Sequence, residues 1–198
     1  MRRLILLLMI LLIVLVGCNK GAITNVDMGN KVPITWIDDD GNAGFYTKLK
    51  PLAVEFGIPF TSAIITNRGF GGRYMTLEQM QEMADLGCEF VSHMHSHDKD
   101  NRPSSMSEEE LHYEFSKSKQ IIKELGFNDN VVVYPFGSEN DLVRKIASEY
   151  YDVGIDTWNS NKPLGNIVGI PFDQYRIERV SAEVDDIKEV FKKIDEAV

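Results

Sequence analysis

Short apolar runs alternate with longer amphipathic stretches along most of this chain. The short runs are rich in β-branched and aromatic residues, which is typical of strands buried on both faces of a sheet. The longer stretches repeat apolar residues at intervals of three and four, which predicts helices that cover such a sheet. The predicted strands lie at 34–37, 60–66, 90–91, 131–134, 152–155 and 175–180.

Helix signals occupy the stretches between these strands. Thr76 with Gln79 and Ser107 with Glu110 have the spacing of capping boxes, which mark the first turns of helices. Strands that alternate with helices of this length indicate parallel βαβ units. We therefore expect an α/β fold whose sheet is closed, or nearly closed, as a barrel. The predicted helices lie at 45–56, 77–86, 108–125, 142–150 and 184–197.

The first residues have a different pattern from the rest. Arg2 and Arg3 precede an apolar run at 4–16 that is short for a membrane span, and Gly17 and Cys18 close it. This ending resembles the lipobox of bacterial lipoproteins, which implies a signal peptide at 1–17 and lipid attached to Cys18. An uncleaved N-terminal anchor is the alternative, and either would place the protein outside the cytoplasm.

Composition limits the possibilities for the residues after this leader. The polar segment 18–31 is expected to be a tether, and 32–198 is long enough for one domain with a sizeable core. Without Arg2 and Arg3, the 21 basic residues of the chain fall to 19 against 30 acidic ones, a charge of 19 − 30 = −11, which argues against a nucleic-acid partner because little could neutralise a phosphate backbone. Only Cys18 and Cys88 occur, so no disulfide framework is expected. Cys88 is predicted to be a small buried residue at a strand start.

The first predicted strand runs directly into Asp38, Asp39, Asp40 and Gly41. Carboxylates this close repel one another, which raises the proton affinity of at least one of them unless a cation offsets the charge. A metal site explains the cluster economically, while a solvated acidic turn is the simpler alternative. Asp39 and Asp40 can serve one site only if the strand has ended by Asp39 and Gly41 permits a sharp turn.

The third predicted strand ends in a group of histidines. His93, His95 and His97 account for three of the four histidines of the chain, which makes a chance cluster less plausible. His93 and His97 would face one side if the segment formed a helical turn, and with one carboxylate they could hold a metal with open positions. For His95, metal ligation and a supporting or surface role are both open. Functional groups collect where parallel strands end, so these histidines and the aspartates are candidates for one site.

Three strand ends, taken together, resemble the first three motifs of the polysaccharide deacetylases, the NodB-homology enzymes of carbohydrate esterase family 4. The matching segments are 35–41 (TWIDDDG), 93–97 (HMHSH) and 134–137 (YPFG). Each motif alone is weak, but their joint order and spacing are specific. The resemblance covers the domain from about Val32 and implies a distorted (β/α) barrel of the NodB type.

The resemblance also implies roles for individual residues. Asp39 would be the general base, and Asp40, His93 and His97 would be the metal ligands. The cofactor would be a divalent metal, with zinc as the expected ion. Such a cation polarises the acetyl carbonyl and lowers the pKa of bound water, while Asp39 takes the proton as the water attacks.

The third motif would form part of the substrate site. Pro135 and Phe136 are expected to contact the polysaccharide, and by resemblance the backbone N–H of Phe136 would stabilise the oxyanion. The rings of Tyr134, Phe136 and Trp158 could also stack on a pyranose, although core packing is the more common role for each ring.

The chain departs from the family pattern at several positions. Met94 stands where Ser or Thr usually follows the first metal histidine, so a hydrogen bond that braces the loop is either missing or supplied by Ser96. The arginine often found before the proline of the third motif is absent, which leaves Arg176 or Arg179 as candidates to orient Asp39.

The last motif of the family has no counterpart in this sequence. In the family it is a strand that ends in a histidine, which protonates the leaving amine. The remaining histidine here, His112, lies within a predicted helix. Either the sequence is a fragment without its final strand or the general acid is absent. Loss of such an acid typically costs about 10²–10⁴-fold in rate.

The leading hypothesis is a metal-dependent hydrolase that removes N-acetyl groups from a polysaccharide containing N-acetylglucosamine. One alternative is an O-acetyl esterase acting on xylan or another glycan. Another is a catalytically impaired lipoprotein that binds glycans and keeps the metal. The expected partners are a polysaccharide and, through lipid on Cys18, a membrane of the cell envelope.

Overall fold

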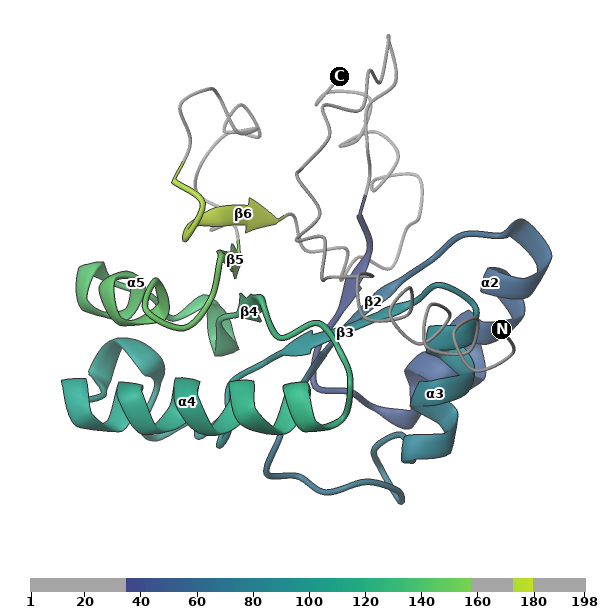
Figure 1. Cartoon of the computed structure of the whole chain (residues 1–198), viewed down its shortest axis with the longest axis horizontal. Helices are drawn as coiled ribbons and strands as arrows, with labels where there is room; N and C mark the ends of the chain where they lie inside the picture. The colour runs from purple at the N-terminus through teal and green to yellow at the C-terminus, as the bar shows by residue number, and fades with distance from the viewer. Residues whose placement is uncertain (1–34, 158–172, 180–198) are drawn as a thin grey trace, which may run out of the picture. The chain divides into compact units, whose positions relative to one another are not determined.

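Parallel strands that follow one another in sequence make up the centre of the fold. The structure is a computed structural model that describes residues 35–157 and 173–179. Each strand pairs in parallel with the next one along the chain, so the strand order in the sheet is the sequence order (Figure 1). The strands are β1 (Ile37–Asp38), β2 (Thr61–Ile64), β3 (Glu89–Ser92), β4 (Val131–Val133), β5 (Val153–Thr157) and β6 (Ile177–Arg179).

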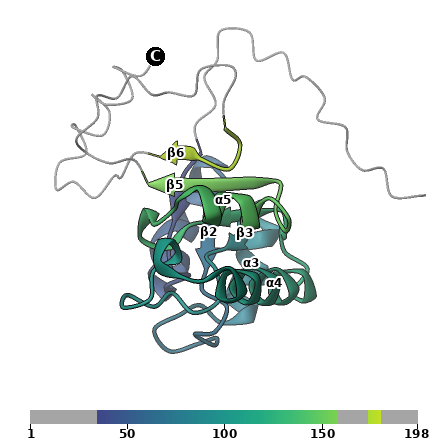
Figure 2. The same ribbon diagram turned by 90° about the vertical axis from the view of Figure 1, so that its left-hand side faces the viewer.

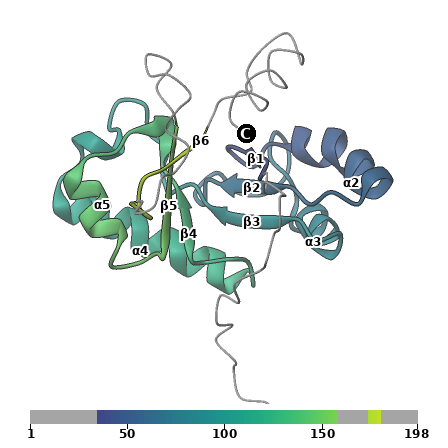
Figure 3. The ribbon, with the colours of Figure 1, turned by 90° about the horizontal axis from the view of Figure 1, so that it is seen from above.

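Helices occupy the connections between these strands, as the alternating pattern predicted. They are η1 (Phe45–Leu49), α2 (Lys50–Phe56), α3 (Leu77–Asp85), α4 (Glu108–Glu124) and α5 (Asp141–Ala147), with short turns η2 (Pro103–Ser105) and η3 (Pro135–Gly137). Figure 3 shows α2 and α3 together beside β2 and β3, and α4 and α5 together near β4 and β5; α4 also contacts β3.

Both predicted capping boxes form. The Thr76 hydroxyl accepts a hydrogen bond from the backbone N–H of Gln79, and the Gln79 side chain accepts one from the N–H of Thr76. Ser107 and Glu110 make the same reciprocal pair at the start of α4. These bonds satisfy N–H groups that the first turn of a helix leaves without partners, so local side-chain chemistry sets both starts.

Several elements differ from their predicted lengths. The strand predicted at 60–66 spans Thr61–Ile64, and the helix predicted at 142–150 spans Asp141–Ala147. The fifth strand extends to Thr157, two residues beyond its predicted end. For the elements that lie within residues 35–157 and 173–179, the predicted types and their order are confirmed.

The sheet buries apolar side chains on both faces, as expected for parallel strands. Ala63, Val91 and Val133 form a small cluster contributed by three adjacent strands. Two larger clusters involve the helices: one includes residues of η1, α2 and α3, and the other residues of α4 and α5. Cys88 is buried in the first of these, with a free thiol, as predicted.

The sheet curls so that its first and last strands approach each other. Arg179, at the end of β6, forms an ion pair with Asp39, directly after β1. Figure 2 shows β6 lying beside β5 at one edge of the described fold. A parallel sheet with outer helices that curls in this way is a distorted (β/α) barrel, which confirms the predicted fold class.

Some predicted features fall outside the described residues. They are the signal peptide at 1–17, the lipidation site Cys18, the tether at 18–31, the domain start at Val32, Trp158, the irregular segment 159–169 and the helix at 184–197. Among the described residues, no helix has the length and apolar character needed to cross a membrane.

Candidate metal centre and active site

The aspartates after β1 lie in a tight turn. The strand ends at Asp38, and both Asp40 (φ 73°) and Gly41 (φ 72°) adopt left-handed backbone conformations. Glycine adopts left-handed backbone without steric strain, so Gly41 stabilises the turn, whereas the same conformation at Asp40 raises the free energy of the fold. The strand has thus ended before Asp39, and a sharp turn follows at Gly41, so Asp39 and Asp40 can serve one site.

The histidines after β3 come together without a helical turn. The segment 93–97 is a loop, in which Met94 (φ 60°) and His97 (φ 51°) are left-handed. This loop brings the rings of His93 and His97 to a centroid distance of 4.9 Å. The structure thus brings together the two histidines that the spacing paired, but through a loop, so the predicted helical turn was wrong.

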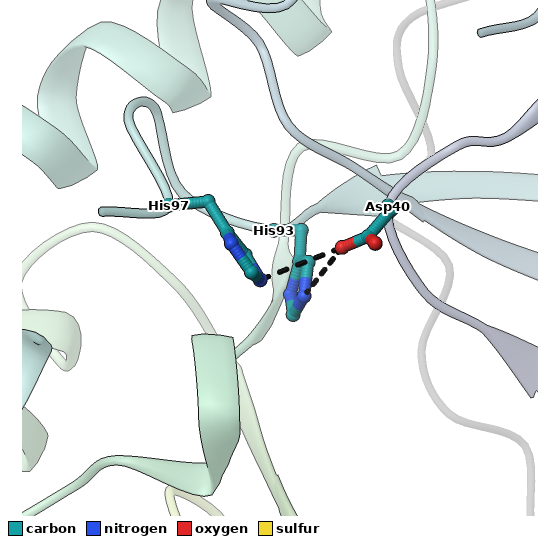
Figure 4. Close-up of side chains that lie close together, drawn as sticks. All are labelled: Asp40, His93 and His97. Atoms are coloured by element: carbon teal, nitrogen blue, oxygen red, sulfur yellow. Dashed lines mark ion pairs between the residues drawn. The ribbon is translucent and has the colours of Figure 1, made fainter. Parts of the chain in front are cut away.

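Three of the predicted residues converge on one point. The Oδ1 atom of Asp40 lies 3.4 Å from Nε2 of His97 and 3.8 Å from Nε2 of His93, as Figure 4 shows. All three candidate ligand atoms lie within 4.8 Å of one another. They come from two neighbouring loops, and together they could hold a metal ion.

Burial and a backbone carbonyl prepare His93 as a ligand. Its Nδ1 lies 2.7 Å from the carbonyl oxygen of Val133, and because a carbonyl only accepts, Nδ1 carries the proton. The Nε2 lone pair therefore faces Asp40. Burial lowers the pKa of the His93 imidazole, which favours the neutral form that binds metals.

The histidine loop is braced from α4. Glu114 is buried, and its Oε2 accepts hydrogen bonds from the backbone N–H groups of His95 (2.9 Å) and Ser96 (2.8 Å). The brace that Met94 cannot supply is thus provided by Glu114, a residue that the sequence patterns did not single out. A signal was present, because a carboxylate at position 114 falls on the apolar face between Leu111 and Phe115.

His95 is not one of the three converging candidate ligands. Its Nδ1 lies 2.9 Å from the hydroxyl of Thr66, and its ring meets Tyr113 edge-on. His95 therefore has a supporting position. His112 is also separate from this group, since its Nδ1 lies 2.8 Å from the Tyr150 hydroxyl.

Asp39 lies beside the candidate ligands and is held by an arginine. Its Oδ2 pairs with Nη2 of Arg179 and lies 4.0 Å from Nε2 of His93. Its Oδ1 is buried and has no hydrogen-bond partner among the described residues. Of the two arginines considered from the sequence, Arg179 contacts Asp39, whereas Nε of Arg176 lies 3.3 Å from Glu139.

Asp38 carries the effect expected of crowded carboxylates. Burial, and then repulsion from Asp39 and Asp40, raise the pKa of Asp38 to about 6. The sequence predicted the direction from repulsion, but burial is the larger cause. Its Oδ2 has no hydrogen-bond partner among the described residues.

The third motif forms a strained turn against the histidines. Pro135 is buried, whereas Phe136 is 41% exposed and adopts φ 61°. The Phe136 ring lies 4.3 Å from the His97 ring, centroid to centroid. Tyr134 belongs to the core: it is fully buried, and its hydroxyl donates to the Tyr175 carbonyl. Phe136 is thus the exposed ring next to the site.

Comparison with known proteins gives one family. The profile described as polysaccharide deacetylase matches residues 28–154. A search of curated proteins found no match.

Solved structures of deacetylases share the fold. The Streptococcus pyogenes deacetylase PplD has 24% sequence identity, with 77% of this chain and 67% of that chain covered and a TM-score of 0.63. A de-N-acetylase from Aggregatibacter actinomycetemcomitans has 17% identity, with 87% and 80% covered and a TM-score of 0.63. BC0361, a polysaccharide deacetylase from Bacillus cereus, has 19% identity, with 82% and 51% covered and a TM-score of 0.65.

Proposed function

This chain belongs to the polysaccharide deacetylase family, and from that premise we propose that it is a metal-dependent hydrolase that removes N-acetyl groups from a polysaccharide containing N-acetylglucosamine. The observation that carries the proposal is the convergence of Asp40, His93 and His97 beside Asp39. The two imidazoles and the Asp40 carboxylate would hold the cation, and the adjacent Asp39 carboxylate would accept the proton of the attacking water.

The three ligand atoms fit a divalent cation. Ligands about 2.0–2.1 Å from a tetrahedral zinc ion lie about 3.3 Å from one another, and Asp40 lies 3.4 and 3.8 Å from the two imidazole nitrogens. The donor set also suits zinc, which accepts nitrogen and carboxylate oxygen. When bound, the cation supplies Lewis acidity toward the acetyl carbonyl and lowers the pKa of water.

Asp39 is the general base in this proposal. One of its oxygens is held by Arg179, and the other has no partner among the described residues and is available to a water proton. The Arg179 guanidinium holds the carboxylate in one orientation, so that its other oxygen can accept the proton. Arg179 is thus a positioning residue.

The turn at Phe136 lies beside the candidate ligands and would form part of the substrate site. Pro135 is buried and anchors the turn, while Phe136 is exposed beside His97. We assign the backbone N–H of Phe136 to the oxyanion that forms when the acetyl carbonyl is attacked. The Phe136 ring offers an apolar face to the sugar.

Metal content and acetate release test the proposal together. We expect the purified protein to contain about one divalent cation and to release acetate from chitooligosaccharides more readily than from acetylated xylan. Asp39→Asn should keep the cation and lose turnover by about 10²–10⁴-fold, whereas His93→Ala should lose the cation. Equal cation content in all three proteins would refute the ligand assignment, and faster release from xylan would identify an O-acetyl esterase. Binding of glycans without release from either substrate would indicate an impaired enzyme.

We also propose that the protein is a lipoprotein of the cell envelope, anchored through Cys18. The basic start, the apolar run and the lipobox-like ending support this location. Cys18→Ser should move the protein from the membrane fraction to the soluble fraction when the natural leader is kept. Unchanged membrane association would favour an uncleaved anchor.

A further inference from the structure

A guanidinium group lies against the exposed ring of the site. The Arg102 side chain is exposed and stands over Phe136, with its central carbon 4.8 Å from the ring centroid. The same ring lies 4.3 Å from the ring of His97. The charge of Arg102 is therefore one aromatic ring away from a candidate metal ligand.

The loop that carries Arg102 is fastened to the Phe136 turn. The backbone N–H and the hydroxyl of Ser104 lie 3.1 and 2.8 Å from the Ser138 hydroxyl. The Asn140 side chain donates to the Ser104 carbonyl at 3.0 Å. The Nε of Arg102 donates to the Lys99 carbonyl at 3.4 Å. These contacts fix the guanidinium relative to the ring before any ligand arrives.

Within the described residues, no carboxylate lies within ion-pair distance of Arg102, although the chain as a whole is acidic, with a net charge of −9. Arg68 likewise forms no ion pair with a described carboxylate, and its Nη2 donates to the His97 carbonyl at 3.3 Å. Positive charge so close to a cation site opposes metal binding, so it is not explained by support of the metal. An anion brought by the substrate would offset this cost.

We propose that Arg102, held on Phe136, is a specificity-determining residue that binds an anionic group, carboxylate or phosphate, on the acetylated sugar or its neighbour. The inference rests on the proposed function only in placing the acetyl group at Asp40, His93 and His97. Arg102 uses its Nε for the Lys99 carbonyl, while its two terminal Nη groups have no partner among the described residues and can make paired, charge-assisted hydrogen bonds with such a group. The substrate class is therefore an acidic glycan.

Titration calorimetry with the metal-loaded, full-length Asp39→Asn protein tests the role of Arg102, because this variant binds glycans without turning them over. The probes are a neutral N-acetylglucosamine tetramer, a tetrasaccharide that alternates N-acetylglucosamine with glucuronic acid, and the neutral tetramer carrying a 6-phosphate. We expect one of the acidic probes to bind more tightly than the neutral one, and the tighter one identifies carboxylate or phosphate as the source of the charge. Adding Arg102→Gln should weaken that binding by roughly tenfold, the loss expected for one charge-assisted contact, and leave neutral binding unchanged.

Lys99→Gln is the matched control, because Lys99 is exposed in the same loop and the substitution removes the same charge. It should leave the preference for the acidic probe intact, and thermal unfolding should show that both variants are folded. If both substitutions weakened binding of the acidic probe equally, the proposal would be overturned, because the preference would then come from the general positive charge of the loop and not from Arg102. A protein that shows no preference for either acidic probe would overturn it as well. Absence of acetate release from every glycan would instead refute the proposed function and leave this binding comparison unaffected.

Discussion

Backbone strain is concentrated at the candidate site. Among the described residues, the non-glycine residues with positive φ are Asp40, Met94, His97 and Phe136. Each costs of the order of 1–3 kcal/mol, and such a conformation persists only when the surrounding structure enforces it. Two of them are candidate ligands, one separates the two histidines, and one carries the proposed oxyanion donor. These strained conformations lower the stability of the fold, but they direct the candidate ligands and the proposed N–H donor toward the candidate metal site.

The first prediction for a single residue concerns the contact between Arg179 and Asp39. Arg179→Gln removes the ion pair that orients the proposed base, so acetate release should fall by about 10²-fold while cation content stays at the wild-type level. Steady-state kinetics with metal analysis measures both, and the loss should appear in kcat more than in KM.

Arg176→Gln is the matched control for this experiment. Arg176 also lies next to β6, but the contact of its Nε is with Glu139. The control should therefore keep its kcat. A comparable loss in both variants would show that Arg179 acts through the stability of the strand and not through Asp39.

At the scale of elements, α4 supports the histidine loop through a single buried carboxylate. Glu114→Ala leaves the backbone N–H groups of His95 and Ser96 without their acceptor. We expect a loss of about 2 kcal/mol in the free energy of unfolding. Cation affinity should fall by about 10–100-fold, as for other groups that position metal ligands.

Thermal unfolding and cation titration measure these two effects. Glu109→Ala serves as the control, since Glu109 is exposed on the same helix. It should change neither quantity appreciably. Wild-type cation affinity in Glu114→Ala would show that the loop keeps its conformation without the brace.

A second element-scale prediction concerns the close approach of β5 to its neighbours. A Cβ atom on Gly154 would lie 2.2 Å from the Tyr134 hydroxyl and 2.8 Å from the Tyr175 carbonyl oxygen. Gly154→Ala should therefore destabilise the protein by about 2 kcal/mol. It should also lower acetate release, because displacement of Tyr175 would shift the following strand, β6, which carries Arg179.

The Tyr134→Phe background checks the cause. Removing the hydroxyl takes away the nearest clash, so Gly154→Ala should cost less there than in the wild type when chemical denaturation is compared. An equal cost in the two backgrounds would assign the effect to the strand backbone and not to Tyr134.

The whole fold divides into parts that the sequence predicts and parts that it does not. Helix starts at Thr76 and Ser107 depend on neighbours three residues away, and the buried strands on their own composition, so both were predicted. The contact of Arg179 with Asp39 spans 140 positions and depends on how far the sheet curls. Local patterns do not contain that information. They indicated His93, His97 and the aspartate cluster, because strand ends of a parallel sheet meet at one edge, whereas the choice of Asp40 as a ligand came from the family resemblance. They did not predict the left-handed loop that joins the histidines.

The pH dependence of the stability of the whole molecule gives a final prediction. The pKa of Asp38 is raised from 3.8 to about 6, so between these values the folded protein binds more protons than the unfolded chain. This contribution favours folding at low pH and is lost as the pH rises through about 6. Removing the charge with Asp38→Asn should therefore stabilise the metal-free protein at about pH 7.5, and have little effect at about pH 4. Because the carboxyl is partly exposed, we discount the full shift and expect a gain of about 1 kcal/mol.

Denaturant unfolding isolates the contribution of Asp38 to stability. Wild type and Asp38→Asn are compared at both pH values in the presence of a chelator. The comparison between proteins at each pH is necessary because His93 acts in the opposite direction. Its lowered pKa favours the unfolded chain as the pH falls below 6.5, and this contribution is common to both proteins. A gain for Asp38→Asn that is larger at low pH would mean that Asp38 is stabilised in its charged form. Burial and the neighbouring carboxylates would then not determine the protonation of Asp38.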